Sequence, residues 1–285
     1  MRQSSCLRTL VLSILLPLQG LSQVDFDFKN LLINCVDRWV VFQREKDSTW
    51  ALGFVYFDTQ AGLTLNYEGK MSRSAEGVYS VARNENGMFK YRLQPNQVQV
   101  ALLPENKFEE LGIKKSPDWL AIYNRDTTSI TRLYKRGFAL NAWGECARAL
   151  DYLSRASQAD PKYPGLTVEM SFSYNCLEQY DKAIALLEAA ISNNPDDAYL
   201  KKELIYSHTK SGDLPKAGEL LKKALAELKD TSYHAESCYN LLYSYFMKKD
   251  KKNFAAWLDE TKKWGKGNEQ ITKSIGLMEK ELAKN

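Results

Sequence analysis

The chain has 285 residues, of which 44% are hydrophobic and 26% are charged, so its composition is that of one or two soluble globular domains. Its formal net charge is +4, and two of the positive charges, Arg2 and Arg8, lie in a segment that we expect to be removed. The remaining charge of about +2 is too small to predict a nucleic-acid partner, and the sequence has no basic stripe.

Residues 1–22 have the organisation of a secretory signal peptide. Two arginines precede an apolar run over residues 10–18, and Gly20-Leu21-Ser22 fits a small-x-small cleavage site. The apolar run is too short to span a bilayer as a mature helix, although an N-terminal membrane anchor is the alternative. We therefore expect an exported protein, periplasmic or extracellular, with no integral membrane segment after cleavage.

Four cysteines remain after this cleavage, and none of them belongs to a CxxC pair. Export permits disulfides, so their state stays open for all four: Cys35, Cys146, Cys176 and Cys238. The last three lie in helical patterns beside apolar residues, which favours buried free thiols.

Residues 23–105 are predicted to form a β-rich domain. Apolar and polar residues alternate over residues 63–68, 89–94 and 98–102, as in strands with one buried and one exposed face. Residues 50–57 are more uniformly apolar, which is typical of a central strand, and residues 58–62 fit a hairpin loop after it. Short strands joined by short turns predict an antiparallel β-meander. Residues 38–44 are a further candidate strand, and residues 30–35 fit either helix or strand.

The β-rich segment contains none of the residue patterns that would predict an enzyme. It has no histidine, no glycine-rich phosphate loop and no Ser, His and Asp in a known spacing. Asp25, Asp27 and Asp37 lack the spacing of a calcium loop, and the whole chain has two histidines. We predict no metal site and no cofactor.

Residues 106–129 are predicted to be a helical connector. Ser116 and Pro117 suit an N-cap and a first helical position. Trp119, Leu120 and Tyr123 follow at helical spacing, so this short helix is expected to pack on the β-rich domain or on the next helix.

From residue 130 onward the sequence repeats with a period of 34 residues, and each repeat contains two amphipathic helices. The step of 34 separates residues in five registers: Pro161 and Pro195; Ala149, Ala183 and Ala217; Ala156, Ala190 and Ala224; Leu153, Leu187 and Leu221; Phe138, Phe172 and Tyr206. A period of this size indicates a stacked array of supersecondary units.

These units resemble tetratricopeptide repeats. The resemblance is carried by Gly137, Leu140, Ala149, Ala156 and Pro161, then by Tyr174, Ala183, Ala190 and Pro195, then by Leu204, Gly212, Ala217 and Ala224. Three positions depart from the pattern: Ser171, Ile205 and Lys229. A degenerate fourth unit starts near His234, and residues 268–284 fit a capping helix. The expected fold is therefore α+β, with an antiparallel β-meander followed over residues 130–285 by an α-solenoid of three to four helix pairs.

The resemblance implies a concave groove lined by the first helix of each pair. Positions one step around the helix from the packing face predict the partner-binding residues Tyr134, Phe138, Asn141, Phe172, Asn175, Tyr206, Lys210 and Tyr243. The aromatic residues among them either anchor a partner or pack between adjacent units. The Lys/Asn pattern of chaperone-tail clamps in this family is absent, so a C-terminal carboxylate ligand is not expected.

Two functional hypotheses follow. The first is a non-enzymatic exported scaffold that binds a protein or peptide in the groove, with the β-rich domain as a second docking surface or as the part that positions the array at an envelope complex. The second is a carbohydrate-binding or uptake accessory protein, in which Trp39, Trp50, Tyr56 and Tyr67 would stack on sugar rings.

Overall fold

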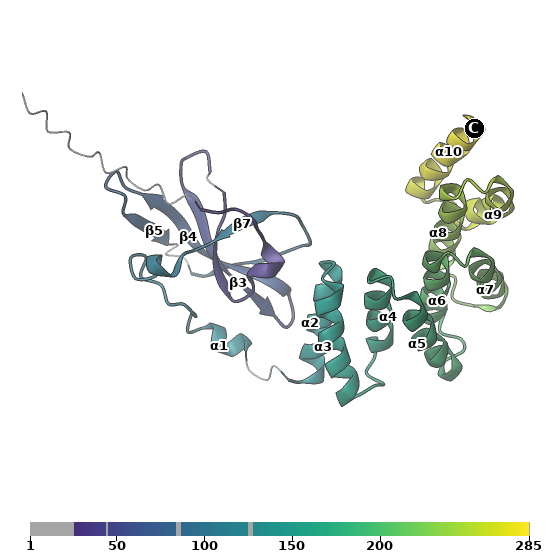
Figure 1. Cartoon of the computed structure of the whole chain (residues 1–285), viewed down its shortest axis with the longest axis horizontal. Helices are drawn as coiled ribbons and strands as arrows, with labels where there is room; N and C mark the ends of the chain where they lie inside the picture. Colours follow the sequence, from purple (N-terminus) through teal and green to yellow (C-terminus); the bar gives the residue numbers. More distant parts are fainter. Residues whose placement is uncertain (1–25, 44, 84–86, 125–127, 285) are drawn as a thin grey trace, which may run out of the picture.

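The computed structural model describes residues 26–43, 45–83, 87–124 and 128–284, so the expected signal peptide lies outside the described residues. A seven-stranded antiparallel sheet comes first in the chain, and an array of helices follows it. Figure 1 shows the sheet at one end of the molecule and the helices stacked away from it in chain order. The predicted α+β fold is confirmed.

The sheet contains a meander that is closed by a strand from later in the chain. Its strands are β1 (Asn30–Leu31), β2 (Arg38–Val41), β3 (Trp50–Asp58), β4 (Gly62–Arg73), β5 (Tyr79–Arg83), β6 (Phe89–Arg92) and β7 (Gln99–Leu102). Strands β2 to β5 lie side by side in sequence order, and β6 pairs with the first part of β4. Strand β7 returns to pair with β2 and β1. Residues 30–35, which fit either helix or strand, are divided between β1 and the 3-10 helix η1 (Leu32–Cys35).

Strand β3 is central because both of its faces are covered. Phe54 and Tyr56 belong to the core under one face, whereas Val55 and Phe57 belong to the core under the other. Since successive side chains of a strand point to opposite faces, burial on both faces needs an almost continuous apolar sequence. This explains why residues 50–57 lack the alternation seen in the other predicted strands.

The connector covers one of these faces. It contains the 3-10 helix η2 (Glu105–Lys107) and the one-turn helix α1 (Leu120–Tyr123). The ring of Trp119 lies 5.8 Å from that of Phe54 and 5.0 Å from that of Tyr56. The connector therefore packs on the β-rich domain, and its helix begins three residues after the proline predicted to open it.

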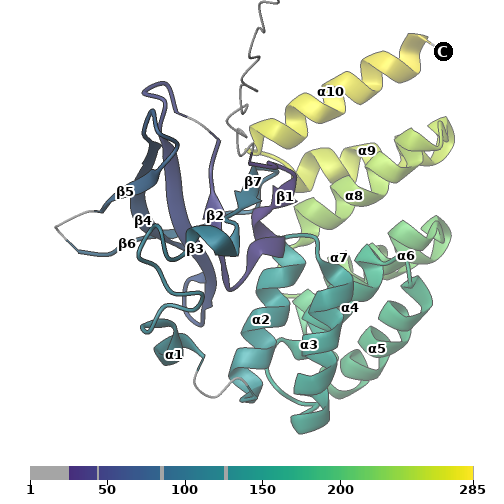
Figure 2. The same cartoon turned by 60° about the vertical axis from the view of Figure 1, so that its left-hand side comes forward.

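Over residues 128–284 the helices form four antiparallel pairs and a final single helix. Figure 2 shows their stacking from a second side. The pairs are α2 (Ile130–Ala142) with α3 (Cys146–Ala159), α4 (Leu166–Cys176) with α5 (Tyr180–Asn193), α6 (Ala198–Ser211) with α7 (Leu214–Glu227), and α8 (His234–Met247) with α9 (Lys251–Trp264). Helix α10 (Glu269–Lys284) buries Ile271, Ile275 and Met278 against the fourth pair, so it caps the array as predicted.

The 34-residue period marks the positions where paired helices approach most closely. Ala149 and Leu153 of α3 are fully buried against α2. A Cβ atom on Gly137 would lie only 2.4 Å from Cγ of Leu153. The first pair therefore needs glycine at this position.

The second face of the sheet packs on the first helix pair. One continuous core contains Val55, Phe57 and Leu63 of the sheet together with Leu140 of α2 and Leu153 of α3. All five side chains are buried. The β-rich domain and the array consequently share a hydrophobic core.

The close approach at residue 137 can be tested with a pair of Gly→Ala variants. We expect Gly137→Ala to lower the free energy of unfolding by about 1–3 kcal/mol, because the added methyl group overpacks the contact between α2 and α3. Gly276 in α10 has open space around it, so Gly276→Ala should raise the free energy of unfolding by about 0.5–1 kcal/mol through helix propensity alone. Urea unfolding followed by circular dichroism measures both changes. Equal effects of the two variants would contradict the packing described here.

Candidate functional site: the inner surface of the helical array

The first helices of the pairs form the inner layer of the array. Helices α2, α4, α6 and α8 contact one another in series as well as their own partners. Because helical side chains three or four residues apart share a face, each of these helices presents one face to its neighbours and another to the groove. The predicted site residues divide between these two faces.

Asn141 and Asn175 lie on the faces between neighbouring inner helices, and both are buried. The Nδ2 atom of Asn141 donates to the backbone oxygen and to Oε2 of Glu169, both at 2.9 Å, and its Oδ1 accepts from Ser173 at 2.8 Å. Nδ2 of Asn175 donates to Oγ of Ser207 at 2.9 Å. These amides join α2 to α4 and α4 to α6, so their Nδ2 groups are used in bonds between neighbouring helices.

The aromatic residues of the predicted ladder are exposed or half-buried. Phe138 is 51% exposed, and Phe172 and Tyr243 are each 43% exposed. Tyr206 is half-buried, with the ammonium group of Lys210 located 5.4 Å from its ring centroid. Tyr134 is also half-buried and packs against Phe138 and Tyr163.

Four predicted residues come together in one depression between the second and third pairs. Phe172 and Asn175 of α4 and Tyr206 and Lys210 of α6 line a pocket of about 230 Å³. Cys176 also lines this pocket. The 34-residue step from Phe172 to Tyr206 thus brings two aromatic rings from consecutive inner helices to the same depression.

A second aromatic cluster, between α6 and the segment before α8, was not predicted. The rings of Tyr199 and Tyr233 stack with their centroids 5.3 Å apart. Lys202 lies over both rings and forms ion pairs with Glu203 at 2.7 Å and Glu236 at 3.2 Å. These carboxylates raise the pKa of Lys202 although burial, the largest influence, acts in the opposite direction. Tyr199 and Tyr233 are 34 residues apart, so the repeat register contained a signal for this cluster.

The expectation that Cys146 and Cys176 are free thiols is wrong. They form a disulfide, with Cα atoms 6.2 Å apart. Cys146 opens α3 and Cys176 ends α4, so the antiparallel packing of these consecutive helices brings residues 30 positions apart into contact. The bridge ties the first repeat to the second at the edge of the pocket described above.

Cys35 and Cys238 are buried free thiols. For Cys238 this is the state that the sequence pattern favoured. Burial raises the pKa of Cys35 to about 11 and that of Cys238 to about 12. Since the thiolate is the reactive form, neither cysteine has the properties of a catalytic nucleophile.

The aromatic residues proposed to bind sugar do not form an exposed platform. Trp39 is 5% exposed and Tyr56 is 0% exposed, and both lie in the core beneath the connector. Trp50 is half-buried against Phe26, and Tyr67 is half-buried. This corrects the carbohydrate hypothesis in its stated form, because a stacking face for a sugar ring must be accessible.

Within the described ranges, no group of three or more His, Cys, Asp or Glu side chains is arranged to hold a metal ion. In the same part of the chain, no helix combines the length and the apolar character needed to cross a membrane.

The model of the tetratricopeptide repeat family matches residues 142–202 and, in an overlapping second match, residues 177–236. No curated protein matches the sequence. Similar solved structures include MamA (41-end) from Desulfovibrio magneticus RS-1, with 20% identity, coverage of 58% of this chain and 88% of that chain, and a TM-score of 0.43. A tetratricopeptide repeat protein from Parabacteroides merdae ATCC 43184 has 16% identity, coverage of 61% and 62%, and a TM-score of 0.44.

A third similar structure is YrrB, described as a tetratricopeptide repeat protein with an unusual peptide-binding site. It has 20% identity, coverage of 51% of this chain and 73% of that chain, and a TM-score of 0.41. Similarities at these levels carry no argument about what this chain binds.

The disulfide assignment predicts the thiol count of a chain that begins at residue 23. Under oxidising conditions, two thiols should react with Ellman's reagent after denaturation and few before it, because Cys35 and Cys238 are buried. A Cys146→Ser/Cys176→Ser variant should keep those two thiols and lose about 2–4 kcal/mol of stability, since its unfolded state is no longer cross-linked. Four reactive thiols in the oxidised, denatured parent chain would contradict the assignment.

Proposed function

Since the helical part of this chain is built from tetratricopeptide repeats, we propose that it is a non-enzymatic scaffold that binds a peptide or protein segment along the inner surface of α2, α4, α6 and α8. The observation that carries the proposal is the row of exposed aromatic rings on that surface, Phe138, Phe172 and Tyr243. Water-exposed aromatic side chains in a row cost solvation free energy unless a partner covers them. They also lose little conformational entropy when they are buried at an interface.

The polar groups beside these rings favour a peptide as the partner. Lys210 and Glu178 line the pocket between Phe172 and Tyr206 and offer a donor and an acceptor at its edge. The buried Asn141 and Asn175 bonds hold the inner helices in register, so the rings are presented on a rigid surface. A preformed surface reduces the entropy lost on binding.

Export is part of the proposal. It is supported by the signal-like sequence of residues 1–22 and by the Cys146–Cys176 disulfide, because structural disulfides persist in oxidising compartments. The expected address is periplasmic or extracellular. There the β-rich domain would position the array, as a second docking surface or at an envelope complex.

The groove assignment predicts a loss of partner binding when the rings are removed. A Phe138→Ala/Phe172→Ala variant should bind its partner at least about tenfold more weakly, because exposed aromatic anchors contribute to binding more than to folding. Affinity capture from envelope extract followed by titration of the captured partner measures this loss.

Leu277→Ala is the matched control, because Leu277 is 60% exposed on α10 outside the groove and its truncation should leave binding unchanged. Circular dichroism should show intact helices in both variants. Unchanged capture by the double variant would place the binding surface elsewhere.

A further inference from the structure

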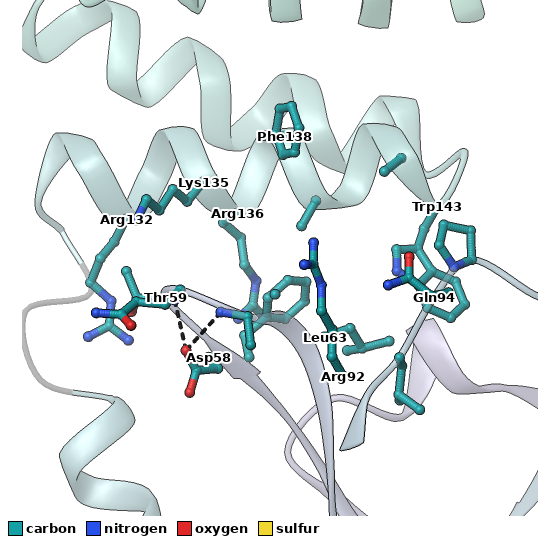
Figure 3. Close-up of a pocket in the computed structure, with 18 of the residues that line it drawn as sticks. Asp58, Thr59, Leu63, Arg92, Gln94, Arg132, Lys135, Arg136, Phe138 and Trp143 are labelled. Carbon is teal, nitrogen blue, oxygen red and sulfur yellow. Dashed lines mark hydrogen bonds between the residues drawn. The ribbon is translucent and has the colours of Figure 1, made fainter. Parts of the chain in front are cut away.

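A cavity of about 340 Å³ opens between the sheet and the first helix pair. Its lower wall is the loop between β3 and β4 and the end of β6, and its upper wall is α2 (Figure 3). This is the volume of a small-molecule site, which typically ranges over about 300–1,000 Å³. The cavity is separate from the pocket between Phe172 and Tyr206, although Tyr134 and Phe138 lie at its edge.

The cavity is strongly basic. Arg92 from β6 and Arg132, Lys135 and Arg136 from α2 line it. Figure 3 shows Arg92 rising from the sheet and Arg136 descending from α2 into the same space. Like charges that converge from two elements repel each other unless an anion lies between them.

The carboxylates around the cavity leave most of this positive charge unpaired. Asp58 is the single acidic residue among those that line the cavity. Its Oδ1 accepts from the backbone N–H groups of Gln60 at 2.7 Å and Ala61 at 3.0 Å, so Asp58 holds the β3–β4 loop. Within the described ranges, neither Arg92 nor Lys135 nor Arg136 forms an ion pair.

Arg136 is the most constrained of these cations. Its guanidinium carbon lies 3.8 Å from the ring centroid of Phe57, and its Nε is buried without a hydrogen-bond partner among the described residues. Burial lowers its pKa, while Tyr152 and Asp37 favour its charged form. A buried donor without an acceptor costs free energy that a bound oxyanion would recover.

The rest of the lining is apolar. Phe57, Leu63 and Leu93 from the sheet side and Ala139 and Trp143 from the helix side supply apolar surface. Figure 3 shows Leu63 next to Arg92 and Trp143 next to Gln94. A ligand that fills the cavity therefore needs an apolar body next to its charged group.

We propose that this cavity binds a small organic oxyanion, with a carboxylate or phosphate head between Arg92 and the α2 cations and an apolar body against Phe57 and Trp143. This site is additional to the peptide groove and does not depend on it. Because the ligand would contact both the sheet and α2, its binding stabilises their packing.

The proposal is tested with three probes of similar size: phenyl phosphate, phenylacetate and neutral benzyl alcohol. Isothermal titration of the full mature chain should show saturable binding of at least one anion, with the alcohol at least about tenfold weaker because it offers no acceptor charge. The two anions distinguish a phosphate head from a carboxylate head. Saturable binding of neither anion would overturn the proposal.

Arg92→Gln and Lys135→Gln remove one cation from each wall, and both side chains are exposed, so the fold should remain. Each change should weaken binding of the anion by about tenfold. Lys229→Gln, an exposed cation on the segment after α7, is the control and should leave the affinity unchanged.

A second readout separates binding from a structural role. Without ligand, Arg92→Gln should melt at the same temperature as the parent chain or higher, because one of two converging charges is gone. With phenyl phosphate, its melting temperature should rise less than that of the parent chain. Affinities that neither variant changes would overturn the proposal.

Discussion

The structure depends on the contact between the sheet and the first helix pair. Val55 and Phe57 of β3 and Leu63 of β4 are buried against α2 and α3. A repeat array leaves an apolar face at each end, and a sheet with two apolar faces needs a cover on both. In this chain the first helix pair covers one apolar face of the sheet, and the sheet covers the apolar end of the array. The β-rich domain thus caps one end of the array as α10 caps the opposite end.

This contact also creates the two candidate binding surfaces. It fixes α2 as the first wall of the inner surface, on which Phe138 points away from the sheet (Figure 3). On the other side of α2, it leaves the basic cavity between Arg92 and Arg136. A peptide groove and a small-anion cavity can coexist because Arg136 descends from α2 into the cavity while Phe138, at the edge of the cavity, points away from the sheet. Occupation of the cavity would strengthen the sheet–helix packing on which the groove is built.

The parts of the fold governed by local pattern were predictable. The 34-residue step identified the helix pairs because Ala149, Leu153 and their counterparts occupy the same packing position in each repeat. The apolar run of residues 50–57 identified the central strand, because a strand that is covered on both faces needs apolar side chains at successive positions. Strand β5 was not predicted because most of its residues are only partly buried or exposed, which leaves no clear alternation in the sequence. The pairing of β7 with β2 was not predicted because these strands are far apart in the sequence.

The candidate site was predictable in position but not in the direction of every side chain. A single helical step selected Phe138 and Phe172, whose side chains are exposed, yet it also included Asn141 and Asn175, which are buried. Those amides turn toward the neighbouring inner helix, which depends on how closely the helices approach. The Cys146–Cys176 bridge was not predicted, because it joins two repeats and its cysteines are 30 residues apart and do not follow the 34-residue step. The basic cavity is lined by residues of both the sheet and α2, so no local sequence pattern could predict it.

The most direct test of the central contact is hydrogen exchange of two variants that differ only in the face they affect. Leu63 is buried against the helices and Leu52 is buried under the connector, so each Leu→Ala change opens a cavity on one side of the sheet. Leu63→Ala should accelerate amide exchange in α2 and α3 as well as in β3 and β4, whereas Leu52→Ala should act mainly on the strands and α1. Faster exchange confined to the sheet in Leu63→Ala would contradict a shared core.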